Sequence, residues 1–342
     1  MSALNLNHLR ANLIEKKANL LAWLASADES EIRTHTGPAN RRAVDTHLTH
    51  LDEAIQKAEE GTLGLCTVCQ DAVDPSLLEM DYTTSVCLSH LPEFEMRQLE
   101  RELELASMVQ RSLLPQNLPA IPGLDLAAYS QPAQIVGGDY FDFLHFADGA
   151  HGMVIADVAG HGVSSSLIMA SVQTALRTLV PISDSPQEVL LRINRLYNHN
   201  INFTSFVTLF LSRFESDGTL TYSNAGHNPP LLLHQNPNKF QDPVWLEPTG
   251  AAIGLVEDIH LQSRSASLRP GDILLLYTDG VTEAMNPSRE QFGPDRLADS
   301  IQRSVALSAG EIVQSVRRDL QAFTTGRPLV DDTTIVACRI VS

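Results

Sequence analysis

The sequence predicts an α+β fold in which a β-sandwich follows an N-terminal module of helices and a short cysteine-containing segment. Beyond about residue 124 the chain contains short apolar runs of β type, separated by turn signals such as Asp217-Gly218. The helical patterns there are clustered instead of alternating with single strands, which argues against a regular α/β sheet. The prolines and glycine of LPQNLPAIPGL, at 114–124, cannot continue a helix and mark the boundary between the two parts.

The N-terminal part is expected to form a helical hairpin between Leu4 and about Glu60. Apolar residues recur at helical spacing on both sides of Thr36-Gly37-Pro38, which interrupt the pattern. Pro92 then opens a third helix, EFEMRQLERELELASMVQRSLL. The predicted domains are residues 1–91 for the hairpin and metal-binding segment, 92–118 for a linker helix and 119–342 for the sandwich.

Eight strands and four helices are expected in the sandwich domain. The strands are LDLAAYSQ, DYFDFLHF, HGMVIADV, FVTLFLSRF, GTLTYSNA, PLLLHQ, DILLLYTD and TTIVACRIV. The helices lie at about 163–179, 186–200, 295–306 and 309–324. Cys338, alone within the last apolar run, is expected to be a small core residue.

The composition excludes several functional classes. The 342 residues include 24 Lys plus Arg and 41 Asp plus Glu, and the formal charge of −17 disfavours binding to nucleic acid or anionic lipid. No apolar run approaches the roughly 20 residues that a membrane span needs, so no membrane association is expected. The first residues lack the apolar core of a secretory signal. We therefore expect a cytoplasmic protein.

Three cysteines and a histidine form two pairs with metal-ligand spacing. Cys66 and Cys69 are two residues apart, and Cys87 and His90 repeat that spacing after 17 residues. Three thiolates and one imidazole suit tetrahedral Zn²⁺, and four protein ligands leave no open position, so we expect one structural zinc ion. The alternatives are a redox-active CxxC pair, although no thioredoxin-like βαβ pattern surrounds it, or three buried thiols beside a surface histidine.

The stretch LDEAIQKAEEGTLGLCTVCQDAVDPSLLEMDYTTSVCLSH resembles the zinc finger of the DksA/TraR family. In that family a helix leads through Glu-Gly-Thr-x-Gly into the first pair of ligands, and the finger accompanies a helical hairpin that reaches RNA polymerase. His90 departs from the family pattern but is compatible with zinc. The acidic hairpin tip is not evident in THTGPANRRA, so the resemblance implies the metal site and not the partner.

Aspartates stand where predicted strands of the sandwich domain begin or end. They are Asp139, Asp157, Asp279 and the pair Asp331-Asp332. Carboxylates held at one sheet edge repel one another unless a multivalent cation neutralises them, and all-oxygen sites favour Mg²⁺ or Mn²⁺. Glycines flank these positions, in Gly137-Gly138, Gly160-His161-Gly162 and Gly280, and allow positive φ or close main-chain approach. Each Asp-Gly alone is also typical of a simple turn.

The C-terminal motifs resemble those of PPM-type protein phosphatases of the SpoIIE/RsbU group. GGDYFDF, IADVAGHGVSSSLIMA, FVTLFLSRF, YSNAGHNPPLLL, LLLYTDGVTEAMN and DDTTIVA occur in the family's order over about residues 115–342. The resemblance implies a β-sandwich flanked by helices. It also implies a centre of two Mn²⁺ or Mg²⁺ ions that removes phosphate from phosphoserine or phosphothreonine.

The same resemblance implies a role for each aspartate. Asp157 would bridge the two ions, with the main-chain carbonyl of Val158 as a further ligand, and Asp139 would hold metal directly or through water. Asp332 stands where relatives have either Asp or Asn. The predicted metal ligands are Asp139, Asp157, Val158, Asp279, Asp331 and Asp332, and the expected catalytic residues among them are Asp139, Asp157 and Asp279.

The general acid is left open by the sequence. PPM enzymes of the eukaryotic type have histidine two residues after the bridging aspartate, whereas His161 lies four residues after Asp157. His161 could donate a proton or stabilise the turn before the next helix. His227, in NAGHNPP, could face the site or fix its loop by hydrogen bonds, and the second role is favoured.

The linker helix has the apolar spacing of a short coiled coil. Its a/d positions are Met96, Leu99, Leu103, Ala106, Gln110 and Leu113. Gln110 could fix the register of paired helices, so a homodimer is expected. The alternative is one amphipathic helix lying on its own domain. The resemblance to RsbU-type phosphatases implies an N-terminal module that binds a regulator.

Together these patterns predict a regulated protein serine/threonine phosphatase. By resemblance, its substrate is expected to be a phosphorylated STAS-type anti-sigma-factor antagonist in a partner-switching pathway. The alternative is an RNA-polymerase-associated zinc-finger regulatory protein whose phosphatase domain is vestigial, although the intact set of aspartates argues against that loss. The sequence identifies neither the activating signal nor the preference between Mn²⁺ and Mg²⁺.

Overall fold

The computed structural model describes short stretches between Arg10 and Ala25 and then most of the remaining chain. The later described residues are 40–73, 78, 82–90, 92–160, 162–200, 205–235, 242–303, 307–327 and 330–341. The chain divides into two units, Met1–Arg101 and Glu102–Ser342. The division lies inside α5 (Glu93–Leu113), which matches the helix expected after Pro92.

The N-terminal unit contains α3 (Asn40–Glu59) and a second helical stretch among the residues described between 10 and 25. Ion pairs join Arg10 to Glu59 and Lys17 to Asp52, so the two stretches run in opposite directions. Their small core contains Leu13, Leu51, Ala54 and Leu63. These contacts support the predicted hairpin, whose expected break at 36–38 lies outside the described residues.

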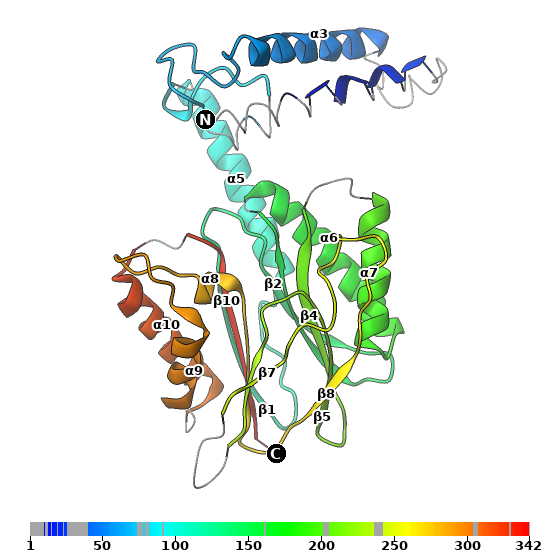
Figure 1. Cartoon of the computed structure of the whole chain (residues 1–342), viewed down its shortest axis with the longest axis vertical. Coiled ribbons are helices and arrows are strands. Elements are labelled where there is room, and N and C mark those ends of the chain that lie inside the picture. The colour runs from blue at the N-terminus through cyan, green and yellow to red at the C-terminus, as the bar shows by residue number, and fades with distance from the viewer. Residues whose placement is uncertain are drawn as a thin grey trace. The chain divides into compact units, whose positions relative to one another are not determined.

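Two antiparallel sheets, each with five described strands, form the centre of the C-terminal unit (Figure 1). The first has the order β1 (Leu124–Gln131), β10 (Thr333–Ile340), β9 (Ile273–Tyr277), β6 (Leu231–Leu233), β7 (Val244–Trp245). The second has the order β2 (Tyr140–His145), β3 (His151–Val158), β4 (Val207–Phe214), β5 (Thr219–Ala225), β8 (Arg264–Ser267).

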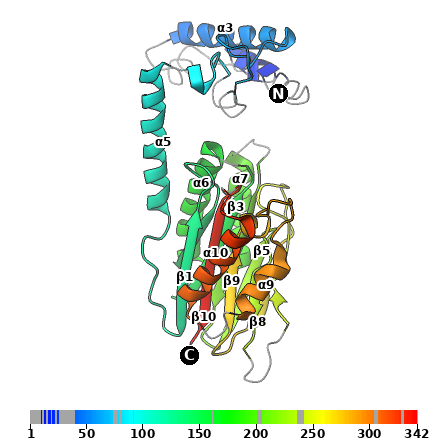
Figure 2. The ribbon, with the colours of Figure 1, turned by 90° about the vertical axis from the view of Figure 1, so that its left-hand side faces the viewer.

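Helices cover the outer face of each sheet (Figures 1 and 2). The sheet that contains β3 packs against α6 (Val163–Leu179), η3 (Val180–Ile182) and α7 (Pro186–Asn200). The sheet that contains β9 packs against α9 (Gly293–Arg303) and α10 (Ala309–Thr324). The predicted β-sandwich flanked by helices is therefore confirmed.

Alternate side chains of the central strands enter different cores. In β9, Leu274 and Leu276 pack between the two sheets, whereas Leu275 and Tyr277 pack against the helices. This double burial explains why the run ILLLY is apolar throughout, since both faces of the strand are covered. Cys338 lies between the sheets and is fully buried, as expected for a core residue.

β7, β8 and α8 (Asp279–Thr282) are among the short elements that the sequence patterns do not predict. β8 is an edge strand with the largely exposed sequence RSAS, so it lacks the alternation of apolar and polar residues that marks a half-buried strand. β7 contains only two residues. α8 replaces the simple turn that Asp-Gly alone would indicate. None of the helices described has the length and hydropathy needed to cross a bilayer.

Candidate active site and zinc cluster

The sheet that contains β2 and β3 brings two predicted aspartates to one of its ends. Asp139 directly precedes β2, Asp157 is the penultimate residue of β3, and the antiparallel register of these strands sets the two opposite each other. Phe141 and Ile155, two residues further along each strand, face the other sheet. Because side chains alternate along a strand, both aspartates lie on the face that points between the sheets.

The sheet that contains β9 and β10 contributes its own strand ends at the same place. β9 and β10 are antiparallel neighbours. Asp279 follows the end of β9, and Asp331-Asp332 precede the start of β10. The Thr278 hydroxyl donates a hydrogen bond to Oδ2 of Asp139 at 2.8 Å, and the main-chain amide of Thr334 donates to the Thr278 oxygen at 2.9 Å. Thr278 therefore joins the ends of the two sheets directly beside the aspartates.

Asp139 is a buried carboxylate with one unsatisfied oxygen. Its side chain is 6% exposed, Oδ2 accepts from Thr278, and Oδ1 has no hydrogen-bond partner among the described residues. Burial, followed by the charge of Asp157, raises its pKa well above the usual range. A buried acceptor without a partner costs free energy, so this oxygen indicates a missing ligand.

The neighbouring carboxyls are perturbed in the same direction. Burial, followed by the charges of Asp279 and Asp331, raises the pKa of Asp157 to about 7. Burial, followed by Asp331, raises the pKa of Asp279 to about 6. An all-oxygen donor set with this mutual repulsion fits hard divalent cations such as Mg²⁺ or Mn²⁺, which would supply the missing positive charge.

Asp332 has a different environment from the other aspartates. Its Oδ1 accepts from the main-chain amide of Ala133 at 2.8 Å, and its Oδ2 accepts from that of Gly138 at 2.6 Å. The side chain is 5% exposed, whereas Asp331 is exposed and accepts the Asp332 amide. Asp332 therefore holds the segment that leads to Asp139.

Glycines at the site permit close main-chain approach. A Cβ on Gly280 would lie 2.0 Å from the carbonyl oxygen of Asp332, and one on Gly138 would lie 2.9 Å from that of Val158. Gly160 and Gly162 instead adopt positive φ, at 101° and 82°. Both explanations offered by the sequence, tight approach and left-handed backbone, therefore apply at different positions.

His227 fixes its loop, as favoured from the sequence. It is buried, its main-chain amide donates to Oδ1 of Asn224 at 2.8 Å, and its Nδ1 lies 2.9 Å from the Thr208 hydroxyl. Its Nε2 donates to the carbonyl of Tyr277 at 3.2 Å, which places the proton on Nε2. Burial lowers its pKa to about 4, so it is neutral at pH 7. His161 lies outside the described residues.

The sequence patterns do not predict a role for Thr278. They also do not predict that the Asp332 carboxylate accepts hydrogen bonds from two main-chain amides. Thr278 directly precedes Asp279, and that position is its only sequence signal. The partners of both side chains come from the distant segment 133–139, and only the folded structure shows this pairing.

In the N-terminal unit, the four predicted zinc ligands converge. Their ligand atoms all lie within 4.8 Å of one another, with Cys69 and Cys87 Sγ 3.8 Å apart and Cys66 Sγ 3.8 Å from Nδ1 of His90. A tetrahedron with zinc-sulfur bonds of about 2.3 Å has sulfur-sulfur edges of about 3.8 Å, which the Cys69–Cys87 pair matches, whereas Cys87 Sγ lies closer to Nδ1 of His90, at 3.0 Å. Among the described residues, this is the one group of His, Cys, Asp or Glu side chains found with its ligand atoms this close together, and the aspartates of the C-terminal unit do not approach one another as closely.

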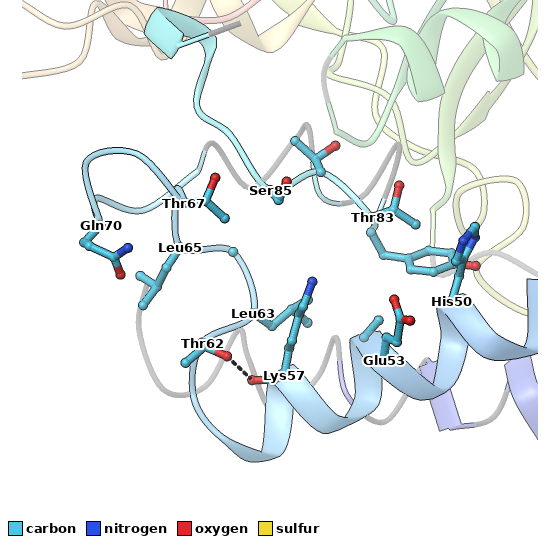
Figure 3. A pocket seen from close by; sticks show the side chains of 14 residues that line it. His50, Glu53, Lys57, Thr62, Leu63, Leu65, Thr67, Gln70, Thr83 and Ser85 are labelled. Carbon is cyan, nitrogen blue, oxygen red and sulfur yellow. Dashed lines mark hydrogen bonds between the residues drawn. The ribbon is translucent and has the colours of Figure 1, made fainter.

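A cavity of about 420 Å³ lies beside this cluster, between α3 and the segment that carries the cysteines (Figure 3). His50 and Lys57 line it from α3, and Thr67 and Ser85 line it from the cysteine segment. All of its lining residues belong to the N-terminal unit, so the aspartates contribute nothing to it.

Comparisons with known proteins find a family match that lies within the C-terminal unit. Residues 147–341 match the family described as stage II sporulation protein E (SpoIIE). The phosphoserine phosphatase RsbU of Bacillus subtilis is 31% identical over 244 residues, which are 71% of this chain and 71% of that protein.

Solved structures agree with this match. The SiaA PP2C domain of Pseudomonas aeruginosa aligns with a TM-score of 0.62 and 23% identity, covering 72% of this chain and 98% of that domain, and it supports the fold. A Mycobacterium tuberculosis protein with RsbU and RsbW domains aligns with a TM-score of 0.56 and 28% identity, covering 67% of this chain and 63% of that one.

Proposed function

Because this chain belongs to the SpoIIE family of PP2C-type phosphatases, we propose that it is a regulated, metal-dependent protein serine/threonine phosphatase. The observation that carries the proposal is the buried, unsatisfied Oδ1 of Asp139 beside carboxyls of raised pKa. Such a set is costly to maintain in a fold without a cation to balance it.

The metal ligands proposed are Asp139, Asp157, the Val158 carbonyl, Asp279 and Asp331. Two Mn²⁺ or Mg²⁺ ions bound there would neutralise the phosphate and supply a water that ionises near neutral pH. Thr278 orients the Asp139 carboxylate through its hydroxyl. The predicted ligand role of Asp332 remains a prediction, and its two amide partners favour a role in holding the segment at 133–138.

We expect the purified protein to release phosphate from a phosphoserine peptide when Mn²⁺ is supplied. EDTA should abolish the release and added Mn²⁺ should restore it, because the carboxylates alone cannot bind an anionic phosphate. Phosphate release is measured with and without metal, and a peptide without phosphate is the control. Phosphate release that EDTA does not reduce would contradict the proposal, and so would a lack of release with both Mn²⁺ and Mg²⁺.

The proposed substrate is a serine-phosphorylated protein of the partner-switching type, such as a STAS-type anti-sigma-factor antagonist. The sequence resemblance to RsbU supports this choice, and the similar structure that combines RsbU and RsbW domains is consistent with it. The relatives found do not support the alternative of an RNA-polymerase regulator with a vestigial phosphatase domain.

One structural zinc ion is proposed in the N-terminal unit, held by Cys66, Cys69, Cys87 and His90. The convergence of all four ligand atoms, which lie within 4.8 Å of one another, supports it. The ligand cluster leads directly into α5, since His90 ends η2 (Leu88–His90) only three residues before the helix begins. The module is therefore suited to bind a regulator and pass its effect along the chain.

The linker helix is proposed to dimerise. No side chain of α5 is fully buried, although its predicted a/d positions are all partly covered. A double change, Leu99→Asp with Leu103→Asp, would place charges in this seam and should convert a dimer to a monomer and alter turnover. Light scattering and phosphatase assays decide it, with the exposed Met108→Asp as a control. Unchanged mass and turnover would make the helix a spacer.

A further inference from the structure

We propose that Gln110, in the linker helix, is a positioning residue for the metal-binding carboxylate of Asp139. It would act through the main chain of Gly137, two residues before that aspartate. The inference rests on the proposed phosphatase function, because it concerns the same metal centre. It gives Gln110 a role different from the coiled-coil register expected from the sequence.

Both polar groups of the Gln110 amide pair with one residue. Its Nε2 donates to the carbonyl oxygen of Gly137, and its Oε1 accepts from the main-chain amide of Gly137 at 3.1 Å. This double pairing fixes the direction of the Gly137 peptide groups as well as their position. The amide of Gln110 is therefore engaged within one chain instead of across a pair of helices.

Three consecutive residues are held by hydrogen bonds from three separate parts of the chain. Gly137 pairs with Gln110 of α5, the Gly138 amide donates to Asp332, and Asp139 accepts from Thr278. Gly137 and Gly138 have no side chains of their own to anchor the segment. A Cβ on Gly137 would lie 2.1 Å from Oδ2 of Asp332, so no other residue could replace it without displacing that carboxylate.

The helix is itself fixed where it presents Gln110. The buried side chain of Gln173, in α6, lies 3.5 Å from the Leu113 carbonyl at the end of α5, and Leu114 packs against the cores on both faces of the sheet that contains β2. The last turns of α5 therefore have a defined place on the C-terminal unit. A shift of these turns would move Gly137 and, through two peptide bonds, Asp139.

The consequence is expected in metal binding, because Asp139 has one oxygen anchored and one without a partner. Without Gln110 the segment loses two main-chain hydrogen bonds and the carboxylate loses its fixed orientation. Outer partners that orient a metal ligand typically contribute roughly 10-fold or more to metal affinity. Folding of the sandwich should persist, since Gln110 lies outside its hydrophobic cores.

The test uses the full chain with Gln110→Met, which keeps the length of the side chain and removes both hydrogen bonds. Isothermal titration with Mn²⁺ should show binding weakened by about 10-fold, and half-maximal phosphatase activity should need correspondingly more Mn²⁺. Gln110→Glu keeps an acceptor for the Gly137 amide but cannot donate to its carbonyl, so it should fall between the wild type and Gln110→Met. This graded order distinguishes positioning from a general loss of stability.

Gln116→Met is the matched control. Its side chain donates only to the Arg111 and Leu114 carbonyls at the end of the same helix, so Mn²⁺ affinity should match the wild type. Hydrogen exchange of the metal-free proteins gives a readout independent of activity: the Gly137 amide should exchange faster in Gln110→Met than in the wild type or Gln116→Met.

The outcomes separate this inference from the proposed function. Wild-type Mn²⁺ affinity and unchanged exchange at Gly137 in Gln110→Met would overturn the positioning role while leaving the phosphatase intact. Equal losses in Gln110→Met and Gln116→Met would overturn it as well, because the effect would then belong to the helix end. A wild-type protein that neither binds Mn²⁺ nor releases phosphate would instead refute the proposed function, and the exchange experiment would still test the Gln110 contact.

Discussion

Replacing Asp157 with Asn should reduce phosphatase activity by at least about 10²-fold, and it should also stabilise the metal-free protein at pH 8. The activity falls because the proposed bridging carboxylate loses its charge. The stability rises because Asn keeps the shape of the side chain but removes a buried negative charge that repels Asp279 and Asp331.

The sign of the stability change follows from the pKa of Asp157, which rises from 3.8 to about 7 in the folded protein. Below about pH 4 the Asp157 carboxyl is protonated in both the folded and the unfolded chain, so it does not lower the free energy of unfolding. As pH rises from about 4 to 7, Asp157 ionises in the unfolded chain before it ionises in the folded protein. The free energy of unfolding therefore falls by up to roughly 4 kcal/mol over this range. The wild type should therefore become less stable as pH rises from about 4 to 7, and the stability of Asp157→Asn should fall by a smaller amount.

Thermal unfolding at pH 5 and pH 8 in EDTA, with phosphatase assays in Mn²⁺, measures both effects. Asp217→Asn is a suitable control, because that aspartate lies in the turn between β4 and β5 and accepts the Thr219 amide. Near wild-type turnover in Asp157→Asn would refute its catalytic role. A variant less stable than the wild type at pH 8 would refute the electrostatic account of the site.

Loss of zinc should unfold the cysteine segment of the N-terminal unit. Structural zinc contributes about 10–16 kcal/mol of apparent binding free energy in small zinc-finger peptides, and the core around Cys66 adds only Val73, Leu78 and their few neighbours. Cys66→Ser with Cys69→Ser should therefore purify with far less than one zinc ion per chain. Elemental analysis and limited proteolysis measure the loss and the unfolding.

Val68→Ser is the matched control for the double variant. It introduces the same residue between the two cysteines at a side chain that is 62% exposed, so zinc content should stay at one per chain. Zinc well below one equivalent in wild-type protein purified without chelators would contradict the assignment. So would protease resistance that survives both cysteine changes.

The sequence predicted the parts of the fold that depend on patterns local to one element. α6, α7 and α10 have the expected bounds because their apolar spacing and flanking residues define them locally. β8 was not predicted, because an exposed edge strand needs only a neighbour for its main chain and no apolar face.

The candidate site shows the same division between local and distant information. Asp139, Asp157 and Asp279 stand out because each interrupts or ends an apolar strand. The contacts of Gln110 and Asp332 with the segment at 133–138 join residues that are 27 and almost 200 positions apart. One sequence contains no signal for such pairings, since their spacing along the chain follows no helical or strand period.

Thr278 and the aspartates place the site where the two sheets meet, with Asp139 and Asp157 from one sheet and Asp279 and Asp331 from the other. Cations shared between these groups would act as a cross-link across the sandwich, so separating the sheets would require their release. Resistance to unfolding would then depend on the free metal concentration, because a ligand that binds only the folded state stabilises it by mass action. In a cell, metal supply would thereby govern how long the phosphatase survives as well as how fast it works.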